Sequence, residues 1–401
     1  FSVFVGVIIL SLFVFSVYYF SSRRGVNHDN TGDISGNADS DSTSKQDKDN
    51  NDIADGKTTD PLNVFFIMHV EPGKIGEGED FQLSESAYNR IKEATLKVAD
   101  ILEKHGMRGN FEIVYRVSTD ALTYEGKDNF IKKLKDRGHL IGLHSHHWML
   151  MQSESQCQEL CSDKCLSTGS SLSPEQKKAG CLVRYGGIED GLDALNKLGF
   201  NDVSVMAFRS FAKKEMDNKT YEFSRAEKLG GKIINDNYSP LDKMAFWSKE
   251  CSDFGHGDNN WYSETGNFLH PWRPDYEDGN LCKNDPDGKI LYIDQVTGDW
   301  FARGNQKTLT KENFDVLRGY FKGAMKHLSS DQMNVWGWPQ HEVEYLSQDE
   351  RGIFSGSYNQ GALDALDDFL SEMDVYRDKG RVKYATLEEI YDEYVKWENK
   401  K

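Results

Sequence analysis

Residues 63–70 (Asn-Val-Phe-Phe-Ile-Met-His-Val) form an almost continuously apolar stretch. Such a run is typical of a strand that is buried on both faces, as strands are in a parallel sheet covered by helices. Apolar residues then recur at helical spacing over residues 87–102, and another short apolar run follows at residues 110–115. This order of strand, helix and strand predicts right-handed crossover connections and a parallel sheet.

The same alternation continues along the chain. Further helix and strand pairs are predicted at residues 129–137 and 138–144, 188–198 and 203–208, 225–230 and 232–235, 311–328 and 334–338, and 360–377 and 382–385, with a closing helix at 387–397. Roughly seven strands thus alternate with helices over about 340 residues, without a clear linker. We therefore predict one α/β domain over residues 61–401, folded as an irregular (β/α)7-type barrel.

An uncharged stretch covers residues 1–20 and ends in two tyrosines and a phenylalanine. Twenty residues in a helix span about 30 Å, the thickness of the hydrocarbon core of a bilayer. A cleaved signal peptide would have a shorter apolar part followed by small residues, whereas Arg23 and Arg24 follow this one. The pattern predicts an uncleaved transmembrane helix over residues 1–22 that anchors the protein to a membrane.

Residues 23–60 contain almost no large apolar side chain, and residues 25–60 hold nine Asp and three Lys, a net charge of −6. Such a segment cannot bury enough surface to offset the entropy cost of ordering it, so a disordered acidic linker is predicted. The linker accounts for a sizeable part of the net charge of −17. The rest of the sequence has no basic stripe, which argues against nucleic acid as a partner.

The chain has six cysteines, five of them within residues 157–251. An even number in a chain with a membrane-targeting segment is typical of disulfides in an oxidising compartment, so we predict that the folded domain lies outside the cytoplasm. The two arginines after the apolar stretch favour the opposite orientation. Cys157, Cys161 and Cys165 lie in an insertion at about residues 151–182, where an iron–sulfur or metal site is the alternative to disulfides.

Residues 138–148 read Gly-His-Leu-Ile-Gly-Leu-His-Ser-His-His-Trp, an apolar strand that ends in three histidines. Side chains in a strand alternate between its two faces, so His144 and His146 point the same way and His147 points the opposite way. Neutral imidazole is a common ligand of zinc and similar metals. The spacing makes this strand end a candidate metal site, with a solvated histidine-rich loop as the alternative.

Ionisable side chains recur where the predicted strands end. They are His69 and Glu71 on the first strand, His144 and His146 on the histidine strand, Arg209 after residues 203–208, Asp236 after 232–235, and His341 with Glu342 after 334–338. In a barrel of parallel strands the functional groups lie at the carboxyl ends of the strands. Their recurrence at five strand ends, with four histidines among them, predicts a metal-dependent active site.

Several short stretches carry a family resemblance. They are Gly138-His139-Leu140-Ile141-Gly142-Leu143-His144, Ala207-Phe208-Arg209-Ser210, Asn235-Asp236-Asn237, His270-Pro271-Trp272-Arg273-Pro274, His341 and Ala385-Thr386-Leu387-Glu388-Glu389-Ile390. Together they resemble motifs of the polysaccharide deacetylases (NodB-homology, carbohydrate esterase family 4), and the first, which is similar to the family's Gly-His-Glu-Ile-Gly-x-His, is the most specific. The resemblance covers about residues 63–394 and implies an irregular (β/α) barrel with a metal-dependent deacetylase activity.

The resemblance also implies a set of metal ligands. Glu71, His144 and His146 would hold a divalent ion, in the first place Zn²⁺, which polarises the acyl carbonyl and activates water. His147 is the alternative to His146. His69 stands where most members have an aspartate, so it is either the general base or a third imidazole ligand that leaves Glu71 as the base.

The family resemblance also implies roles for the remaining site residues. His341 would protonate the leaving group, and Arg209 and Asp236 would orient the base or acid through charged hydrogen bonds. Most members space the two histidines of the second motif four residues apart, whereas Trp148 occupies that position here. Substrate binding is assigned to His270, Trp272, Arg273 and Trp148, with burial in the core as the alternative for the two tryptophans.

We therefore predict a membrane-anchored, metal-dependent hydrolase that removes N- or O-linked acetyl groups from a carbohydrate at the cell envelope. The alternative is a catalytically silent, carbohydrate-binding relative tethered to the membrane. The replacement of the usual aspartate by His69 favours that alternative.

Overall fold

The computed structural model describes residues 60–71, 84–146, 188–209, 223–236, 264–266, 268–278, 280–296, 308–348 and 354–400. All of them belong to one compact unit, Lys57–Lys401. The predicted anchor (1–22), the insertion (151–182) and all of the predicted linker except its last residue lie outside these ranges. In the part of the chain that the structure describes, no helix has the length and apolar character needed to cross a membrane.

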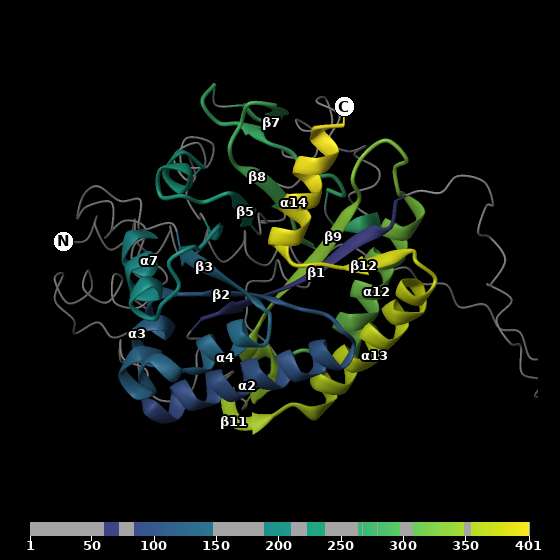
Figure 1. Ribbon diagram of the computed structural model, residues 1–401. Coiled ribbons are helices and arrows are strands. Elements are labelled where there is room, and N and C mark those ends of the chain that lie inside the picture. Colours follow the sequence, from purple (N-terminus) through teal and green to yellow (C-terminus); the bar gives the residue numbers. More distant parts are fainter. Residues whose placement is uncertain are drawn as a thin grey trace, which may run out of the picture. The chain divides into compact units, whose positions relative to one another are not determined.

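The fold is built on an eight-stranded parallel sheet with helices packed against it (Figure 1). Its strands are β1 (Leu62–Val70), β2 (Asn110–Ile113), β3 (Leu140–His146), β4 (Val205–Arg209), β5 (Ile233–Asp236), β8 (Leu291–Asp294), β9 (Val335–His341) and β12 (Val382–Tyr384). They pair in the order β12-β1-β2-β3-β4-β5-β8, and β9 also pairs with β1. The backbone N–H of Val296, just after β8, donates to the carbonyl of Gly337 in β9 at 2.8 Å, so the sheet curves round in the manner of a barrel.

The helices lie between these strands in the chain, as the alternation predicts. They are α2 (Glu85–Lys104), α3 (Tyr115–Tyr124), α4 (Phe130–Asp136), α7 (Ile188–Lys197), α12 (Lys311–Lys326), α13 (Gln360–Asp378) and α14 (Leu387–Glu398). Two small antiparallel pairs join β6 (Pro274–Asp275) to β7 (Asn280–Asn284), and β10 (Leu346–Gln348) to β11 (Phe354–Tyr358). The predicted α/β fold with a parallel sheet is confirmed.

Side-chain caps explain where two of the helices begin. Ser84 accepts a hydrogen bond from the backbone N–H of Ala87 at 3.2 Å and so begins α2. Thr386 accepts one from the N–H of Glu389 at 3.3 Å and begins α14. Each cap satisfies a backbone donor that has no partner within the helix.

The inward-facing side chains of the sheet form their own apolar cluster. Its members include Phe65, Ile67, Leu140, Val205, Ile233, Leu291, Ile293 and Val335 from the strands, and Leu387, Ile390 and Tyr394 from α14. Helix α14 lies at the amino-terminal ends of the strands, because Ser204 before β4 donates to Glu388 and Arg108 before β2 donates to Glu389. Since α14 covers this end of the barrel, the carboxyl ends of the strands are left for a site.

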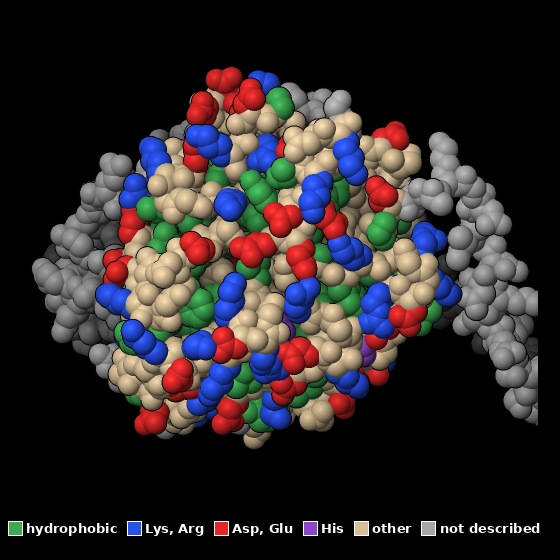
Figure 2. All heavy atoms as spheres, in the orientation of Figure 1, with side chains coloured by type: hydrophobic (Ala, Val, Ile, Leu, Met, Phe, Trp, Pro, Cys, Tyr) green, Lys and Arg blue, Asp and Glu red, His purple; other side chains and the backbone are tan. Residues whose placement is uncertain are grey.

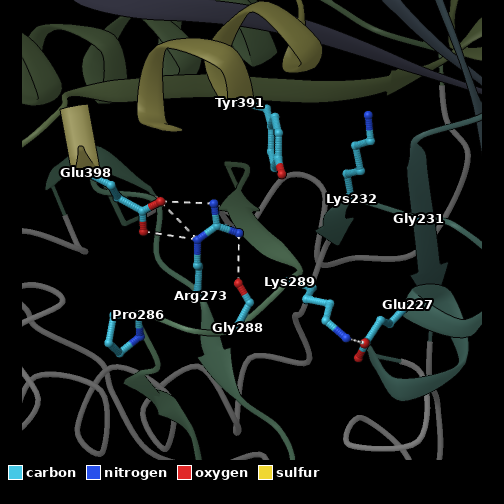
Figure 3. Close-up of a pocket in the computed structure, with 9 residues that line it drawn as sticks. All are labelled: Glu227, Gly231, Lys232, Arg273, Pro286, Gly288, Lys289, Tyr391 and Glu398. Atoms are coloured by element: carbon cyan, nitrogen blue, oxygen red, sulfur yellow. Dashed lines mark hydrogen bonds and ion pairs between the residues drawn. The ribbon is translucent and has the colours of Figure 1, made fainter. Parts of the chain in front are cut away.

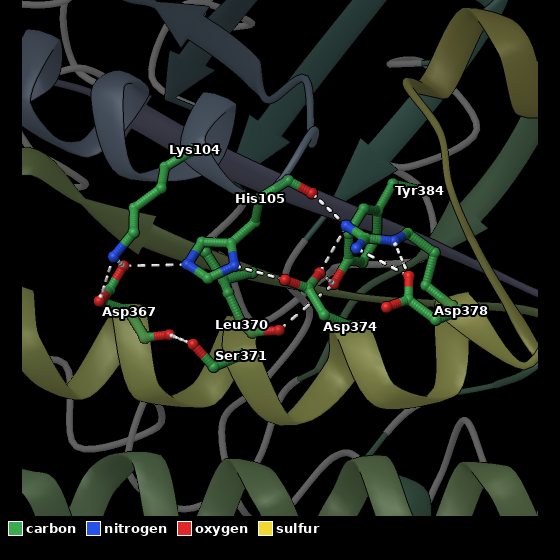
Figure 4. A network of polar contacts seen from close by, with 9 residues as sticks. Lys104, His105, Asp367, Leu370, Ser371, Asp374, Asp378 and Tyr384 are labelled. Carbon is green, nitrogen blue, oxygen red and sulfur yellow. Dashed lines mark hydrogen bonds and ion pairs between the residues drawn. The ribbon is translucent and has the colours of Figure 1, made fainter.

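A polar network ties the end of α2 to α13 (Figure 4). The His105 imidazole lies between two carboxylates, with Nδ1 2.6 Å from Asp374 Oδ2 and Nε2 2.9 Å from Asp367 Oδ1. Arg377 donates to the backbone carbonyl of His105, and the Tyr384 hydroxyl donates to Asp374 at 2.8 Å. These contacts fix the two helices against each other on the outside of the sheet.

The face of the molecule in Figure 2 has mixed charge, with Lys and Arg side chains interspersed among Asp and Glu. Pairs one helical turn apart, such as Lys311 and Asp315 of α12 at 2.8 Å, are one source of such mixing on the protein surface. The prediction that nucleic acid is not a partner stays a prediction.

Cys282 on β7 is the cysteine that falls within the described ranges; it is buried and disulfide-bonded. The other five cysteines lie outside those ranges. The predicted disulfide framework in the insertion therefore stays a prediction.

His139, which directly precedes β3, is buried in contacts that suit a neutral imidazole. Its Nδ1 accepts a hydrogen bond from the N–H of Gly109 at 3.0 Å, and its Nε2 lies 2.8 Å from Glu103 Oε1. Burial lowers the pKa of His139 below its usual 6.5, although the neighbouring Glu103 carboxylate opposes this effect. The unfolded chain therefore binds this proton more readily than the folded protein.

The contribution of His139 to the free energy of unfolding should accordingly be fully present above about pH 6.5, and it should fall as the pH drops below that value. In denaturant titrations at several pH values, His139→Gln should show a smaller fall on acidification than the wild type, because its amide oxygen can still accept from Gly109 but does not titrate. An equal fall in both proteins would contradict this prediction.

Candidate active site

Three buried ionisable side chains meet near the carboxyl ends of neighbouring strands. They are His69 of β1, Glu112 of β2 and His144 of β3, and one nitrogen or oxygen atom of each lies within 4.8 Å of the others. His69 Nε2 is 3.1 Å from Glu112 Oε2, and the rings of His69 and His144 stack with their centroids 4.1 Å apart. We name these three residues the His69 cluster.

The strand register brings the cluster together. His69 is opposite Glu112 in the pairing of β1 with β2, and Glu112 is opposite Gly142 in the pairing of β2 with β3. His144 lies two residues beyond Gly142 and therefore on the same face of β3. A Cβ at position 142 would lie 3.1 Å from Glu112 Cγ, so the glycine makes room for the carboxylate.

Two further ionisable residues adjoin the cluster. Glu71 follows β1, and its carboxylate oxygens lie 3.6 Å from His144 Nε2 and 3.2 Å from His341 Nε2. His341 ends β9, where it is opposite His69 in register. Its other ring nitrogen, Nδ1, lies 3.1 Å from Glu344 Oε1. The His341 imidazole therefore sits between two carboxylates and next to the cluster.

The carboxylates around His341 decide its charge. Burial by itself would lower the pKa of His341, but Glu344 and Glu71 outweigh this effect and raise that pKa to about 10. The imidazole is therefore protonated at neutral pH and can donate a proton from Nε2.

Glu342 supports the backbone next to the cluster. Burial raises the pKa of Glu342 well above its usual value and so favours the neutral form of its carboxyl group. One of its oxygens accepts a hydrogen bond from the backbone N–H of Glu71 at 3.3 Å. Glu342 therefore holds the segment that carries the Glu71 side chain.

The His69 cluster has a donor set that suits a divalent metal ion. Two imidazoles and one carboxylate are a common ligand set of catalytic zinc sites, which leave a further position for water or substrate. All three side chains are buried, and gathering buried ionisable groups is costly unless they pair with one another or bind a metal. The residues present therefore fit a metal ion of this kind.

Three predicted site residues are described only through their backbone. His146, at the end of β3, pairs in register with Arg209 at the end of β4, and Asp236 ends β5. Their strands place them at the same end of the sheet as the His69 cluster. The side chains of these three residues, and all of His147 and Trp148, lie outside the described part of the chain, so their roles stay predictions.

Two of the predicted substrate-binding residues, His270 and Trp272, are packed in the interior. His270 Nδ1 lies 3.1 Å from the carbonyl oxygen of Met333, which precedes β9. The Trp272 side chain is 1% exposed, and its ring packs on Tyr292 with the centroids 4.8 Å apart. The structure does not bring either residue to the His69 cluster.

Arg273 lines an open pocket of about 470 Å³ beside α14 (Figure 3). Its Nε and Nη2 donate to the carboxylate of Glu398 at 3.0 and 2.9 Å, and its Nη1 donates to the carbonyl of Gly288 at 3.0 Å. Tyr391, also on α14, has its ring centroid 5.7 Å from the guanidinium carbon. Arg273 thus ties the closing helix to the β6 segment, and the structure does not place it at the His69 cluster.

Replacement of Arg273 should lower stability and leave catalysis unchanged. Arg273→Met leaves Glu398 partly buried without its cation, so the free energy of unfolding should fall by about 1–3 kcal/mol. The KM for substrate should stay within about twofold of the wild-type value. Denaturant unfolding and steady-state kinetics measure the two quantities.

A control for this variant is Lys289→Met, which breaks the more exposed ion pair with Glu227 in the same pocket. This variant should leave the free energy of unfolding close to the wild-type value, because water screens an exposed ion pair. A large increase in KM for Arg273→Met, with stability unchanged, would instead support the substrate-binding role that the sequence motif predicts.

Sequence reasoning did not find Glu112 or Glu344. Glu112 is a single carboxylate inside the apolar run at residues 110–115, and that isolated charge in a predicted strand was the available signal. Glu344 follows His341 by three residues, which is the spacing that lets it reach back to Nδ1 across the short helix η3 (Glu342–Tyr345). Neither residue belongs to a motif quoted above.

Searches by sequence found no matching family model and no matching curated protein. Among solved structures, the chain is similar to a protein from Mycobacterium smegmatis provisionally described as a polysaccharide deacetylase, at 12% identity and a TM-score of 0.45, over 86% of this chain and 93% of that chain. It is also similar to Puue allantoinase, at 11% identity and a TM-score of 0.39, over 84% of this chain and 89% of that chain. Peptidoglycan deacetylase PdaC from Bacillus subtilis matches at 11% identity and a TM-score of 0.35, over 85% of this chain and 95% of that chain.

At these identities the likeness concerns the fold alone, and with TM-scores below 0.5 it carries no argument about activity. What the site can do follows from the chain's own residues. The fold places His69, His144 and His341 at the carboxyl ends of its parallel strands.

Proposed function

We propose that this protein is a metal-dependent hydrolase that removes acyl groups, above all acetyl groups, from a carbohydrate. The observation that carries the proposal is the His69 cluster, with the Glu71 carboxylate and the protonated His341 beside it. A metal-ligand set, a base and a proton donor are thereby gathered within reach of one substrate group. Hydrolysis of an amide or an ester uses these parts.

His69, Glu112 and His144 would hold the ion, for which Zn²⁺ is the first choice. When bound, a divalent ion supplies Lewis-acid chemistry, because it polarises an acyl carbonyl and lowers the pKa of water. Of the two roles open to His69, the grouping of its ring with Glu112 and His144, whose ligand atoms all lie within 4.8 Å of one another, favours that of a ligand. Glu71 is then left as the general base.

The other residues move and hold protons. Glu71 would accept a proton from the attacking water, and His341 would give its Nε2 proton to the leaving amine or alkoxide. Because Glu71 Oε1 and His341 Nε2 are 3.2 Å apart, a proton can then pass from one to the other and reset both groups. Glu344, by holding Nδ1, keeps Nε2 directed towards Glu71.

The finer parts of the proposal rest on sequence features. The apolar stretch at residues 1–20 supports attachment to a membrane, and the even number of cysteines supports disulfides and a position outside the cytoplasm. With the motif resemblance, these features support a glycan of the cell envelope as the substrate. Membrane fractionation and the accessibility of the folded domain to added protease in intact cells test this location.

The function is tested by measuring metal content and acetate release on the same preparation. The full chain, purified in detergent and loaded with Zn²⁺, should bind about one ion per chain. It should release acetate from N- or O-acetylated oligosaccharides, lose this activity to a chelator and regain it when Zn²⁺ is restored. Bound metal without acetate release across such a panel would reject the hydrolase.

A catalytically silent carbohydrate-binding protein is the second candidate. It is favoured by His69, which occupies the position of the family's usual aspartate and lies against Glu112. This candidate predicts that calorimetry detects binding of an oligosaccharide that the metal-loaded protein leaves unhydrolysed.

A further inference from the structure

Two buried carboxamides, in the described part of the chain, lack hydrogen-bond partners. Asn235 lies in β5 and Gln295 directly follows β8, and neither side chain is exposed. The oxygen and the nitrogen of both amides are without a partner. Buried polar groups are seldom left in this state, because each lost hydrogen bond shifts an equilibrium by a factor of about 10 to 100.

Both amides point into the barrel. Ile233 of β5 and Ile293 of β8 belong to the interior apolar cluster, and Asn235 and Gln295 each lie two residues further along the chain, on the same face. Asn235 is opposite Ile293 in register, so the two amides are diagonal neighbours on adjacent strands. We name them the amide pair.

The amide pair follows the His69 cluster across neighbouring strands on the inner face of the barrel. Ala207 of β4 is opposite His144, and the register of β4 with β5 brings Ala207 next to Asn235. Along this face of the sheet, the methyl group of Ala207 therefore lies between His144 and Asn235 of the amide pair. On its other side, Gln295 lies beside β9, the strand that ends in His341.

We propose that the amide pair is a subsite that recognises the acyl amide of the substrate, so that the protein prefers N-acyl to O-acyl carbohydrates. A carboxamide side chain has both a donor N–H and an acceptor C=O. An acyl amide offers the complementary C=O and N–H, and it satisfies both. An acyl ester has no N–H and leaves a buried side-chain carbonyl unpaired. This inference rests on the proposed function.

The effect of mutations on stability distinguishes a binding role of the amide pair from a structural one. Replacing a buried, unpaired amide by an apolar side chain of similar size removes its desolvation cost. Asn235→Leu and Gln295→Met should therefore keep or raise the midpoint of thermal unfolding. Residues kept for binding rather than for folding often behave in this way.

The test compares two oligosaccharides that differ in one atom per sugar, one with 2-acetamido and one with 2-O-acetyl groups. The Zn²⁺-loaded wild-type chain should have the higher kcat/KM for the 2-acetamido compound. Either variant should lower that value by about 10- to 100-fold, while kcat/KM for the ester changes by less than about threefold. Metal content should be unchanged.

Asn110→Leu is the matched control. Asn110 is also fully buried, but its amide donates to the carbonyl of Phe66 at 2.7 Å and accepts from the N–H of Leu387 at 2.9 Å. This variant should lower the unfolding midpoint and leave the ratio of amide to ester hydrolysis unchanged.

Equal losses on both compounds, or no loss on the amide, in the amide-pair variants would overturn the subsite. If the wild type hydrolyses neither compound, the proposed function fails, and calorimetry then decides the subsite separately. The wild type should bind the 2-acetamido compound more tightly than the ester, and each variant should lose that difference. Equal affinity of the wild type for both compounds would reject the subsite.

Discussion

Glu112→Gln should remove the bound metal, whereas Glu71→Gln should keep the metal and lose turnover. Glu112 is the carboxylate with an oxygen within 4.8 Å of both imidazoles of the His69 cluster, so its neutral amide should weaken metal affinity by at least about 100-fold. Glu71 faces His341 at 3.2 Å, where it can act as the base. Loss of a general base lowers kcat by about 10²- to 10⁴-fold. Metal analysis after dialysis and steady-state kinetics measure both effects.

His144→Ala should behave like Glu112→Gln, and His327→Ala is the matched control. His327 pairs with Glu264 at 2.9 Å near the end of α12 and belongs to no part of the cluster, so that variant should keep both metal and turnover. If Glu71→Gln lost the metal and Glu112→Gln kept it, the ligand set expected from the family motifs, with Glu71 and His146, would replace the one proposed here.

His341→Gln should keep the metal and lower kcat by about 10²- to 10⁴-fold, since it removes the proton donor of the leaving group. Glutamine can still hydrogen-bond to Glu71 and Glu344, which limits disturbance of the fold. A variant with full turnover would remove His341 from the acid role. A variant without metal would show that His341 supports the cluster and does not act on the substrate.

Glu344→Gln tests the same role through pH. Because Glu344 is a main cause of the raised pKa of His341, its removal should lower that pKa from about 10. His341 should then lose its proton at lower pH, so the alkaline limb of the kcat profile should move to lower pH. An unmoved limb, with stability intact, would assign that limb to another group.

Much of the fold could be predicted from local pattern. Apolar runs buried on both faces and helices of regular period have a single favourable arrangement, a parallel sheet covered by helices. Helix α3 was not predicted, because its first residue follows Val114, which offers no side-chain cap, and the preceding strand runs directly into it. Strand β8 and the small antiparallel pairs are short and follow no helix of clear period, so sequence pattern alone did not identify them.

The candidate site was likewise predictable only in part. The position of His69, Glu71, His144 and His341 at strand ends follows from sequence order and the direction of the strands, and the structure brings these four together. The resemblance of the His270 to Pro274 segment to a family loop did not reveal its contacts. Trp272 meets Tyr292 because the segment before β6 bridges to β8, and Arg273 meets Glu398 of α14; no local pattern records either contact.

The sequence by itself determined the parallel α/β architecture and the end of the sheet at which ionisable groups gather, because strand direction and side-chain alternation are local properties of the backbone. Only the tertiary structure decided which carboxylate joins the histidines. Glu112 enters the cluster because the register of β1 with β2 sets it opposite His69 and because Gly142 leaves it room. Register between strands far apart in the chain depends on the packing of the whole barrel, so no stretch of the sequence states it alone.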